Sequence, residues 1–171
     1  NLFHTEQARE LFYQSIREEG LDEAIDSKQT DYFHPLPTTF GVKPMHTPDK
    51  YILFNHRLNN STGWREVLEI FKGLDTDAYL WFTDESNLKV KAELEGIPRV
   101  LVKSVPFESY GYVLANAHFT VCNLQDYATW NMAVLDSINH GTTVISNRTN
   151  LMAELGADNN IDLEDGIKQG I

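Results

Sequence analysis

The sequence predicts an α/β fold in which a doubly wound parallel sheet carries helices on both faces, and two observations support this. Runs of four or five apolar residues, a length typical of buried strands, recur between residues 51 and 145. Each of the first four runs is followed by a longer segment whose apolar residues recur at helical spacing. Strands that are apolar on both faces and alternate with helices require a sheet covered on both sides. We expect this architecture for residues 50–162.

The first 49 residues follow a different pattern. Residues 3–19 place apolar side chains at helical spacing among charged ones, which predicts an amphipathic helix. Between residues 26 and 49 the periodicity disappears and prolines accumulate, so we expect an irregular connector. The resulting division is an interdomain helix and proline-rich connector at residues 1–49 and a Rossmann-like domain at residues 50–171.

Five strands and their helices are predicted in order after this connector. The strands are expected at residues 51–54, 78–82, 99–102, 118–122 and 142–145, with a further strand near 160–162. The helices are expected at residues 64–74, 87–95, 107–117, 130–140 and 151–155. The chain ends in what looks like a starting helix, so we expect the return helices of the fold to be missing. Ligands of such sheets bind beyond the carboxyl ends of the strands, which draws attention to the loops at residues 55–63, 83–87, 103–107, 123–130 and 146–150.

Composition and charge exclude several classes of function. The formal net charge is −11, and the basic residues are scattered singly, so we expect no direct nucleic-acid binding by this domain. No apolar run is long enough to predict a membrane span. The single cysteine, Cys122, lies in an apolar run, which predicts a buried side chain and fits a cytoplasmic protein. The histidines share no metal-ligand spacing, so no metal site is expected.

The loop after the first strand carries groups suited to an anion. Arg57 offers a charged, bidentate donor for a phosphate, and Ser61 or Thr62 is expected to cap the helix that begins near Trp64. The alternative is a capped helix beside a surface arginine.

The loop before the fourth predicted helix is also polar. Thr129 is its expected N-cap, which leaves the amides of residues 130–132 facing a ligand. Asp136 lies among apolar neighbours of the same helix and suits hydrogen bonds to vicinal sugar hydroxyls. The alternative for Asp136 is a solvated helix face.

Two segments carry a family resemblance. Residues 51–58 read Tyr-Ile-Leu-Phe-Asn-His-Arg-Leu, and residues 128–145 read Ala-Thr-Trp-Asn-Met-Ala-Val-Leu-Asp-Ser-Ile-Asn-His-Gly-Thr-Thr-Val-Ile. The first resembles a strand ending in Gly-Arg-Leu, and the second resembles the signature Glu-x-Phe-Gly-x-x-x-Leu-Glu-Ala-x-x-x-Gly-x-Pro-Val-Ile. These two patterns are typical of the C-terminal, donor-nucleotide domain of retaining GT-B glycosyltransferases of family 4, which this chain therefore resembles. Residues 97–107 are similar to the strand and turn that hold the nucleotide base in that family.

The resemblance implies a hexosyltransferase-like enzyme that transfers sugar with retention from a nucleotide-diphosphate sugar, without a metal or other cofactor. The acceptor is unidentified and would be held by an N-terminal domain of the same protein. The implied donor-binding residues are His56, Arg57, Thr62, Ser104, Thr129, Trp130, Asn131 and Asp136.

The sequence departs from the family signature at three positions. Ala128 stands at the first signature acid, with Asp126 two residues earlier as the candidate catalytic residue in contact with the donor sugar. Thr62 stands at the usual lysine and Asn131 at the loop glycine. Three alternatives remain open: a catalytically degenerate interaction or scaffold module, which these departures favour, a sugar-nucleotide epimerase of the same fold, and a transferase that modifies a nucleic-acid base. The last follows from the resemblance of Asn-His-Arg, residues 55–57, to transferases that mannosylate a base of transfer RNA.

Overall fold

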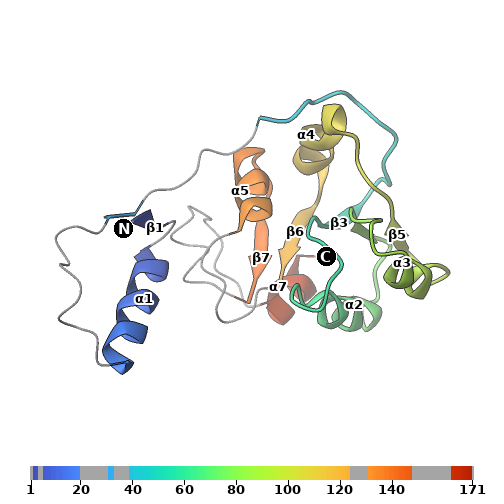
Figure 1. Ribbon diagram of the computed structural model, residues 1–171. Helices are drawn as coiled ribbons and strands as arrows, with labels where there is room; N and C mark the ends of the chain where they lie inside the picture. Colours follow the sequence, from blue (N-terminus) through green and yellow to red (C-terminus); the bar gives the residue numbers. More distant parts are fainter. Residues whose placement is uncertain are drawn as a thin grey trace.

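A parallel sheet of five strands forms the centre of the computed structural model, which describes residues 2–3, 6–19, 31–32, 39–123, 131–147 and 163–170 (Figure 1). The strands are β3 (Tyr51–Phe54), β4 (Tyr79–Phe82), β5 (Val100–Val102), β6 (Phe119–Cys122) and β7 (Val144–Ser146). They lie in the order β5-β4-β3-β6-β7, with every neighbouring pair parallel. The chain therefore builds outward from β3 in one direction, returns, and builds outward from β6 in the other. This reversal puts a topological switch point between β3 and β6.

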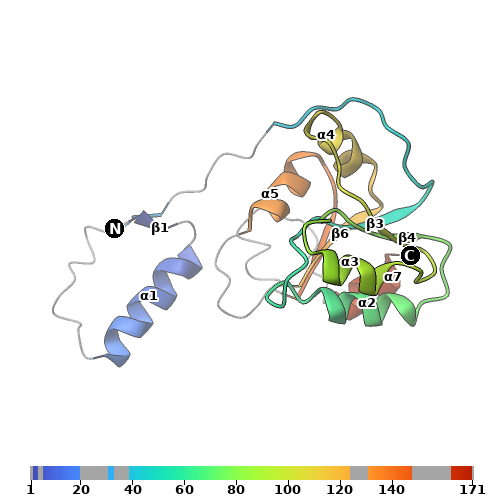
Figure 2. The same ribbon diagram turned by 45° about the vertical axis from the view of Figure 1, so that its right-hand side comes forward.

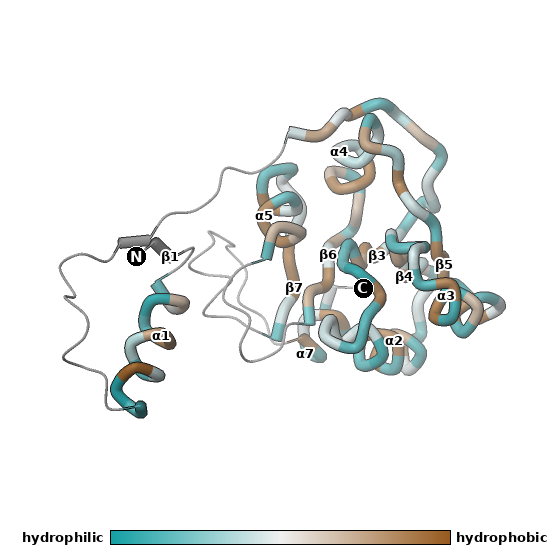
Figure 3. The backbone as a smooth tube through the Cα atoms, viewed as in Figure 1, coloured by the Kyte–Doolittle hydropathy of each residue, from teal (hydrophilic) through white to brown (hydrophobic). Residues whose placement is uncertain are grey.

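Helices cover both faces of this sheet, as a doubly wound fold requires (Figure 2). One face carries α2 (Trp64–Lys72), α3 (Leu88–Leu94) and α7 (Leu163–Gln169), and the other carries α4 (Phe107–Asn116) and α5 (Met132–Asn139). All residues of β3 and β6 are buried, which explains why these strands show no alternation of polar and apolar side chains. Figure 3 shows the strands mainly in hydrophobic colours and the outer turns of α2 in hydrophilic ones. The α/β fold predicted from the sequence is confirmed.

The predicted elements from residue 50 onward agree with the structure to within two or three residues at most ends. The fifth strand is β7, which begins at Val144, two residues later than predicted. Gly141 makes a turn with a φ of 76°, and the Thr142 hydroxyl donates to the Leu114 carbonyl oxygen at 2.6 Å, so the chain joins the sheet only after these contacts. The predicted helix at 151–155 and the strand near 160–162 lie outside the described residues.

The N-terminal prediction is confirmed for its helix and incomplete for its connector. The helix is α1 (Glu6–Glu18), and beside it β1 (Leu2–Phe3) pairs with β2 (Asp31–Tyr32), which falls inside the predicted connector. Strands of two residues are too short to show a period, so sequence patterning does not predict them. Whether the chain divides into domains at residue 49 stays a prediction.

The last part of the connector, residues 39–50, is irregular but packed. Its Lys43 amide donates to the Glu108 carbonyl oxygen at 2.8 Å, and the Gly111 amide donates to the Gly41 carbonyl oxygen at 3.0 Å. A β-carbon at Gly41 would lie 2.4 Å from the Glu108 carbonyl oxygen, so only glycine allows this close approach to α4. The Phe40 ring packs edge-on against Tyr110. This segment is therefore attached to the domain by backbone bonds and an aromatic contact.

Within the described part of the chain, every helix falls short of the length or the apolarity needed to cross a bilayer.

Candidate functional site

The carboxyl ends of the five strands meet at one edge of the sheet, where the crevice between β3 and β4 is closed by hydrogen bonds. Asp84, just after β4, accepts a bond from the Leu58 amide at 2.7 Å. Asn87, the N-cap of α3, donates through Nδ2 to the Leu58 carbonyl oxygen at 2.9 Å. These two bonds tie the loops after β3 and β4 together and occupy the polar groups between them.

The crevice between β4 and β5 is closed in the same way. Both the amide and the hydroxyl of Ser104 donate to Glu85 Oε2 at 2.7 Å, and Lys91 Nζ donates to Glu85 Oε1 at 2.7 Å. These donors hold the pKa of Glu85 at about 2, well below its usual range. Ser104, expected to contact the donor base, is thus bound to Glu85.

The switch point between β3 and β6 is different, because buried polar atoms there remain unused. Asn55, the first residue after β3, donates through Nδ2 to the Ala133 carbonyl oxygen at 3.1 Å and the Ser137 hydroxyl at 3.2 Å, both on α5. The same nitrogen lies 3.0 Å from the Tyr110 hydroxyl of α4. Its Oδ1 is buried and has no hydrogen-bond partner among the described residues. A buried acceptor without a donor is costly, which makes this atom a candidate ligand contact.

His56, the next residue, leaves a second polar atom unused. Its Nδ1 lies 3.4 Å from Nδ2 of Asn131, and because an amide nitrogen only donates, the imidazole proton belongs on Nε2. This buried Nε2 donor also has no partner in the part of the chain that the structure describes. Burial lowers the pKa of His56 to about 4, so the ring is neutral at pH 7. His56 therefore offers an uncharged donor at the switch point.

The N-terminus of α5 lies beside these two residues. Asn131 is its N-cap, and the side chain accepts from the Val134 amide at 3.0 Å. The prediction of Thr129 as the cap is therefore wrong, because the helix begins two residues later than expected. The positive end of the α5 dipole meets Asn131 and His56, an arrangement that favours an anionic ligand. Thr129, Trp130 and Asp126 lie outside the described residues.

Asp136 belongs to the same cluster. It lies on α5 and is only 7% exposed, so the alternative of a solvated helix face is wrong. Burial raises the pKa of Tyr110 to about 12, a hydrogen bond from Asn55 opposes this, and the charge of Asp136 adds to the rise. Because the Asp136 carboxylate raises the pKa of Tyr110, it lies close to that ring, on the α5 side of the crevice that Asn55 and His56 border. The structure therefore brings Asn55, His56, Asn131 and Asp136 together.

Arg57 and Thr62 lie on the outer side of the loop. Burial raises the pKa of Asp84, but hydrogen bonds from Ser86 and Leu58 and the charge of Arg57 together lower it. The exposed guanidinium of Arg57 is thus close to Asp84 on the β4 side of the loop. The Thr62 hydroxyl donates back to the Arg57 carbonyl oxygen at 2.7 Å, inside its own loop.

The helix after this loop has a glycine as its cap. Gly63 is the N-cap of α2, with a φ of 59° and no side-chain capping bond, so the prediction of Ser61 or Thr62 as the cap is wrong. Asn123, the first residue after β6, donates to the Gly63 carbonyl oxygen at 3.3 Å and to Glu66 Oε2 at 2.7 Å. The space that a side chain would need at Gly63 is occupied by Asn123, so a hydroxyl residue cannot act as the cap there.

Sequence reasoning did not select four contributors to this region: Asn55, Tyr110, Asn123 and Ser137. Asn55 and Asn123 each directly follow a strand whose residues are all buried, and a polar residue at that position is a signal that could have identified them. Tyr110 and Ser137 lie within amphipathic helices, where their spacing is that of core residues, and they carry no such signal.

Comparison with known proteins gives the fold class. No protein-family model matches the chain, and no curated protein sequence matches it. Among solved structures, the "GtfA/B complex" matches 95% of this chain with a TM-score of 0.56 and 11% identity. The "lipopolysaccharide outer core galactosyltransferase WaaB apo form" matches 85% with a TM-score of 0.55 and 16% identity. The "Glycotransferase of kitacinnamycin" matches 87% with a TM-score of 0.51 and 20% identity.

These matches establish a Rossmann-like α/β fold of the kind that forms one half of GT-B glycosyltransferases. The matched region spans 33% of the first structure, 42% of the second and 41% of the third, so this chain corresponds to less than half of each. Because the sequence identities are 20% or less, these matches establish only the fold.

Proposed function

We propose that this chain is the donor-binding half of a retaining, hexosyltransferase-like glycosyltransferase, with a nucleotide-diphosphate sugar bound at the switch point. The observation that carries the proposal is the pair of unused buried atoms, Asn55 Oδ1 and His56 Nε2, beside the N-terminus of α5. Ligands of open α/β sheets bind at this position, and an anionic diphosphate matches the helix dipole. The glycosyltransferase-like fold supports the sugar-nucleotide class.

The proposed chemistry is stabilisation of the leaving diphosphate. When the bond between the sugar and the diphosphate breaks, the bridging oxygen keeps the bonding electrons and its negative charge grows. The α5 N-terminus and the His56 Nε2–H donor are already oriented and need no reorganisation, which is the condition for effective electrostatic catalysis. Arg57 would add a cation from the exposed side of the loop. The acceptor would enter from a separate domain of the same protein.

Asp136 takes the role of a hydroxyl acceptor in this proposal. Its carboxylate lies on the α5 side of the crevice and suits the two vicinal hydroxyls of the nucleotide ribose. A carboxylate in the water-excluded crevice forms stronger hydrogen bonds with hydroxyl groups than an exposed one does. Asp126, Thr129 and Trp130 remain predicted contacts, whereas Ser104 and Thr62 are already committed to Glu85 and to their own loop.

The test is a calorimetric titration of the full chain with UDP-, GDP- and ADP-sugars. We expect one nucleotide to bind, and Arg57→Ala to weaken binding at least about 10-fold, because a charged hydrogen bond contributes about 1.5 to 3 kcal/mol. Arg65→Ala is the matched control, since Arg65 is an exposed arginine of α2 that pairs with Glu93 instead. Asp136→Asn should also weaken binding, and a preference for ribose over 2′-deoxyribose nucleotides should disappear in that variant.

Two results would count against the proposal. The first is a protein that contains this chain together with the acceptor domain and still binds no donor. An interaction or scaffold module would then be the better description. If Arg57→Ala and Asp136→Asn bind as the unaltered chain does, the nucleotide lies elsewhere on the fold.

A further inference from the structure

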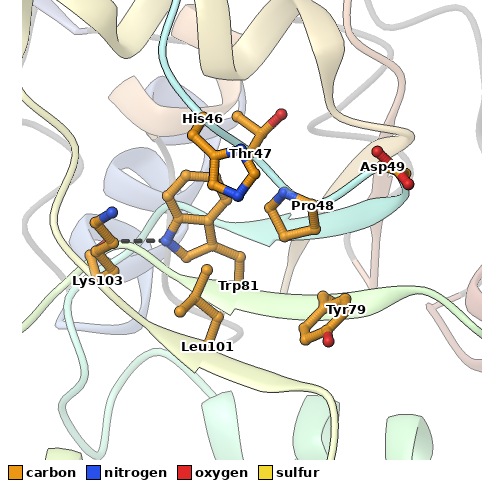
Figure 4. A pocket seen from close by; sticks show the side chains of 8 residues that line it. All are labelled: His46, Thr47, Pro48, Asp49, Tyr79, Trp81, Leu101 and Lys103. Carbon is orange, nitrogen blue, oxygen red and sulfur yellow. Dashed lines mark hydrogen bonds between the residues drawn. The ribbon is translucent and has the colours of Figure 1, made fainter.

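A second concave site lies on the face of the sheet that carries α4, over the outer strands β4 and β5. Residues 46–49 cross this face above the strands and enclose a cavity of about 440 Å³ (Figure 4). The cavity is lined by His46, Thr47, Pro48, Asp49, Tyr79, Trp81, Leu101 and Lys103. None of these residues belongs to the switch-point cluster. Tyr79 begins β4 and Asp49 precedes β3, so this side of the cavity lies at the amino ends of these strands, whereas Lys103 follows β5 at its carboxyl end.

The floor of this cavity is apolar and fixed. Trp81 is 1% exposed, and its Nε1 donates to the Lys103 carbonyl oxygen at 2.7 Å, which ties the indole to the end of β5. Leu101 and Pro48 complete the apolar lining, and Tyr79 adds an aromatic ring that is 41% exposed. An apolar surface with an accessible ring edge favours a ligand that has an apolar side of its own.

The rim of the cavity carries polar groups of both charges that are not used within the protein. His46, Asp49 and the Lys103 ammonium form no side-chain hydrogen bond or ion pair with any described residue, and neither does the Tyr79 hydroxyl. In Figure 4, Lys103 and Asp49 lie on opposite sides of the cavity, with Trp81 and Pro48 between them. An anionic ligand would be attracted by Lys103 and repelled by Asp49. A cationic ligand would be repelled by Lys103 and attracted by Asp49.

We propose that this cavity binds a neutral pyranose unit of an oligosaccharide. Hydroxyl groups both donate and accept, so a sugar ring satisfies a carboxylate at one end and an ammonium at the other without repulsion. The C–H face of a pyranose is apolar and packs against the negative face of an aromatic ring such as Tyr79. The proposal goes beyond donor binding, because it adds a second carbohydrate site that does not depend on the nucleotide.

The test titrates the full chain with three neutral probes, maltotriose, N,N′,N″-triacetylchitotriose and mannotriose. Binding is followed by tryptophan fluorescence and by NMR shifts of the Trp81 indole N–H. At least one trisaccharide should bind saturably and shift that signal. Tyr79→Ala and Asp49→Asn should each weaken binding about 10-fold, as expected for the loss of one aromatic contact or one charged hydrogen bond. Phe107→Ala and Asp75→Asn are the matched controls, because both residues are exposed and lie outside the cavity lining.

Several outcomes overturn the proposal: no trisaccharide shifts the Trp81 signal, glucuronate or glucose 6-phosphate binds here more tightly than the neutral sugars, or the two cavity variants bind unchanged. Folding of the variants is checked by the unaltered dispersion of their NMR spectra. His56→Asn should leave trisaccharide binding intact. Failure of this site is thereby separated from failure of the donor site.

Discussion

At the scale of single residues, His56 shows how burial prepares a side chain for a ligand. The imidazole is buried with only one of its nitrogens engaged, and desolvation keeps it uncharged at neutral pH. A neutral donor can bond a phosphate oxygen without placing a buried positive charge in the empty site, which would be costly. Cys122 shows the opposite case: it is a buried free thiol, as predicted, and burial raises its pKa, so it serves packing.

The lowered pKa of His56 makes stability depend on pH in a defined window. The unfolded chain protonates this histidine below about pH 6.5, whereas the folded chain resists protonation down to about pH 4. Stability from His56 is therefore complete above pH 6.5 and is lost as the pH falls toward 4, by about 3 kcal/mol in total. Urea unfolding of the chain and of His56→Gln across this range should show the difference between their free energies shrinking by that amount. A constant difference would mean that His56 takes up its proton at the same pH in the folded and the unfolded chain.

At the scale of elements, the start of α2 depends on one glycine that the sequence does not single out. Gly63 adopts a φ of 59°, and a β-carbon there would lie 2.3 Å from Asn123 Nδ2. Asn123 in turn bonds Glu66 on the first turn of α2, so the helix start and the end of β6 are held together. Because a hydroxyl residue normally caps a helix, sequence reasoning favoured Ser61 or Thr62, and only the tertiary contact excludes them.

Replacement of this glycine should therefore cost more than backbone strain alone. Gly63→Ala adds about 1 to 2 kcal/mol for the left-handed conformation and about 1 to 3 kcal/mol for the clash with Asn123. Gly96→Ala is the matched control, since Gly96 has a φ of 88° and no atom within 4 Å of the added carbon. Chemical denaturation should show the larger loss for Gly63→Ala. Equal losses in the two variants would show that Asn123 yields to the added carbon.

At the scale of the whole molecule, the described residues show buried polar atoms without a hydrogen bond at the switch point between β3 and β6, whereas hydrogen bonds close the two crevices beside β4. Asp84 and Asn87 close the β3–β4 crevice, and Glu85 with Ser104 closes the next. The five apolar runs predicted this sheet correctly, because runs of only four or five residues have the length of buried strands and are too short for helices. The direction of side chains in the loops was not predictable, because it depends on partners from other strands.

Because loop side chains turn toward partners on other strands, only some of the predicted site residues lie together in the structure. His56, Asn131 and Asp136 meet at the switch point because they lie at the end of β3 and on the start of α5. Arg57 lies close enough to Asp84 to lower its pKa, and Ser104 donates to Glu85; both acids follow β4. No pattern within one segment contains such a pairing. Asp84 lies 27 positions after Arg57, and Glu85 lies 19 positions before Ser104.

The most direct measurement of the central claim compares donor binding by two His56 variants in the full chain. Glutamine places its amide donor near the position of Nε2, whereas asparagine reaches only the position of Nδ1, and both lose the same ring contact with Phe54. If His56 Nε2 donates to the bound nucleotide sugar, His56→Asn should bind at least about 10-fold more weakly than the unaltered chain and His56→Gln should remain close to it. Equal binding by the asparagine and glutamine variants would contradict the account.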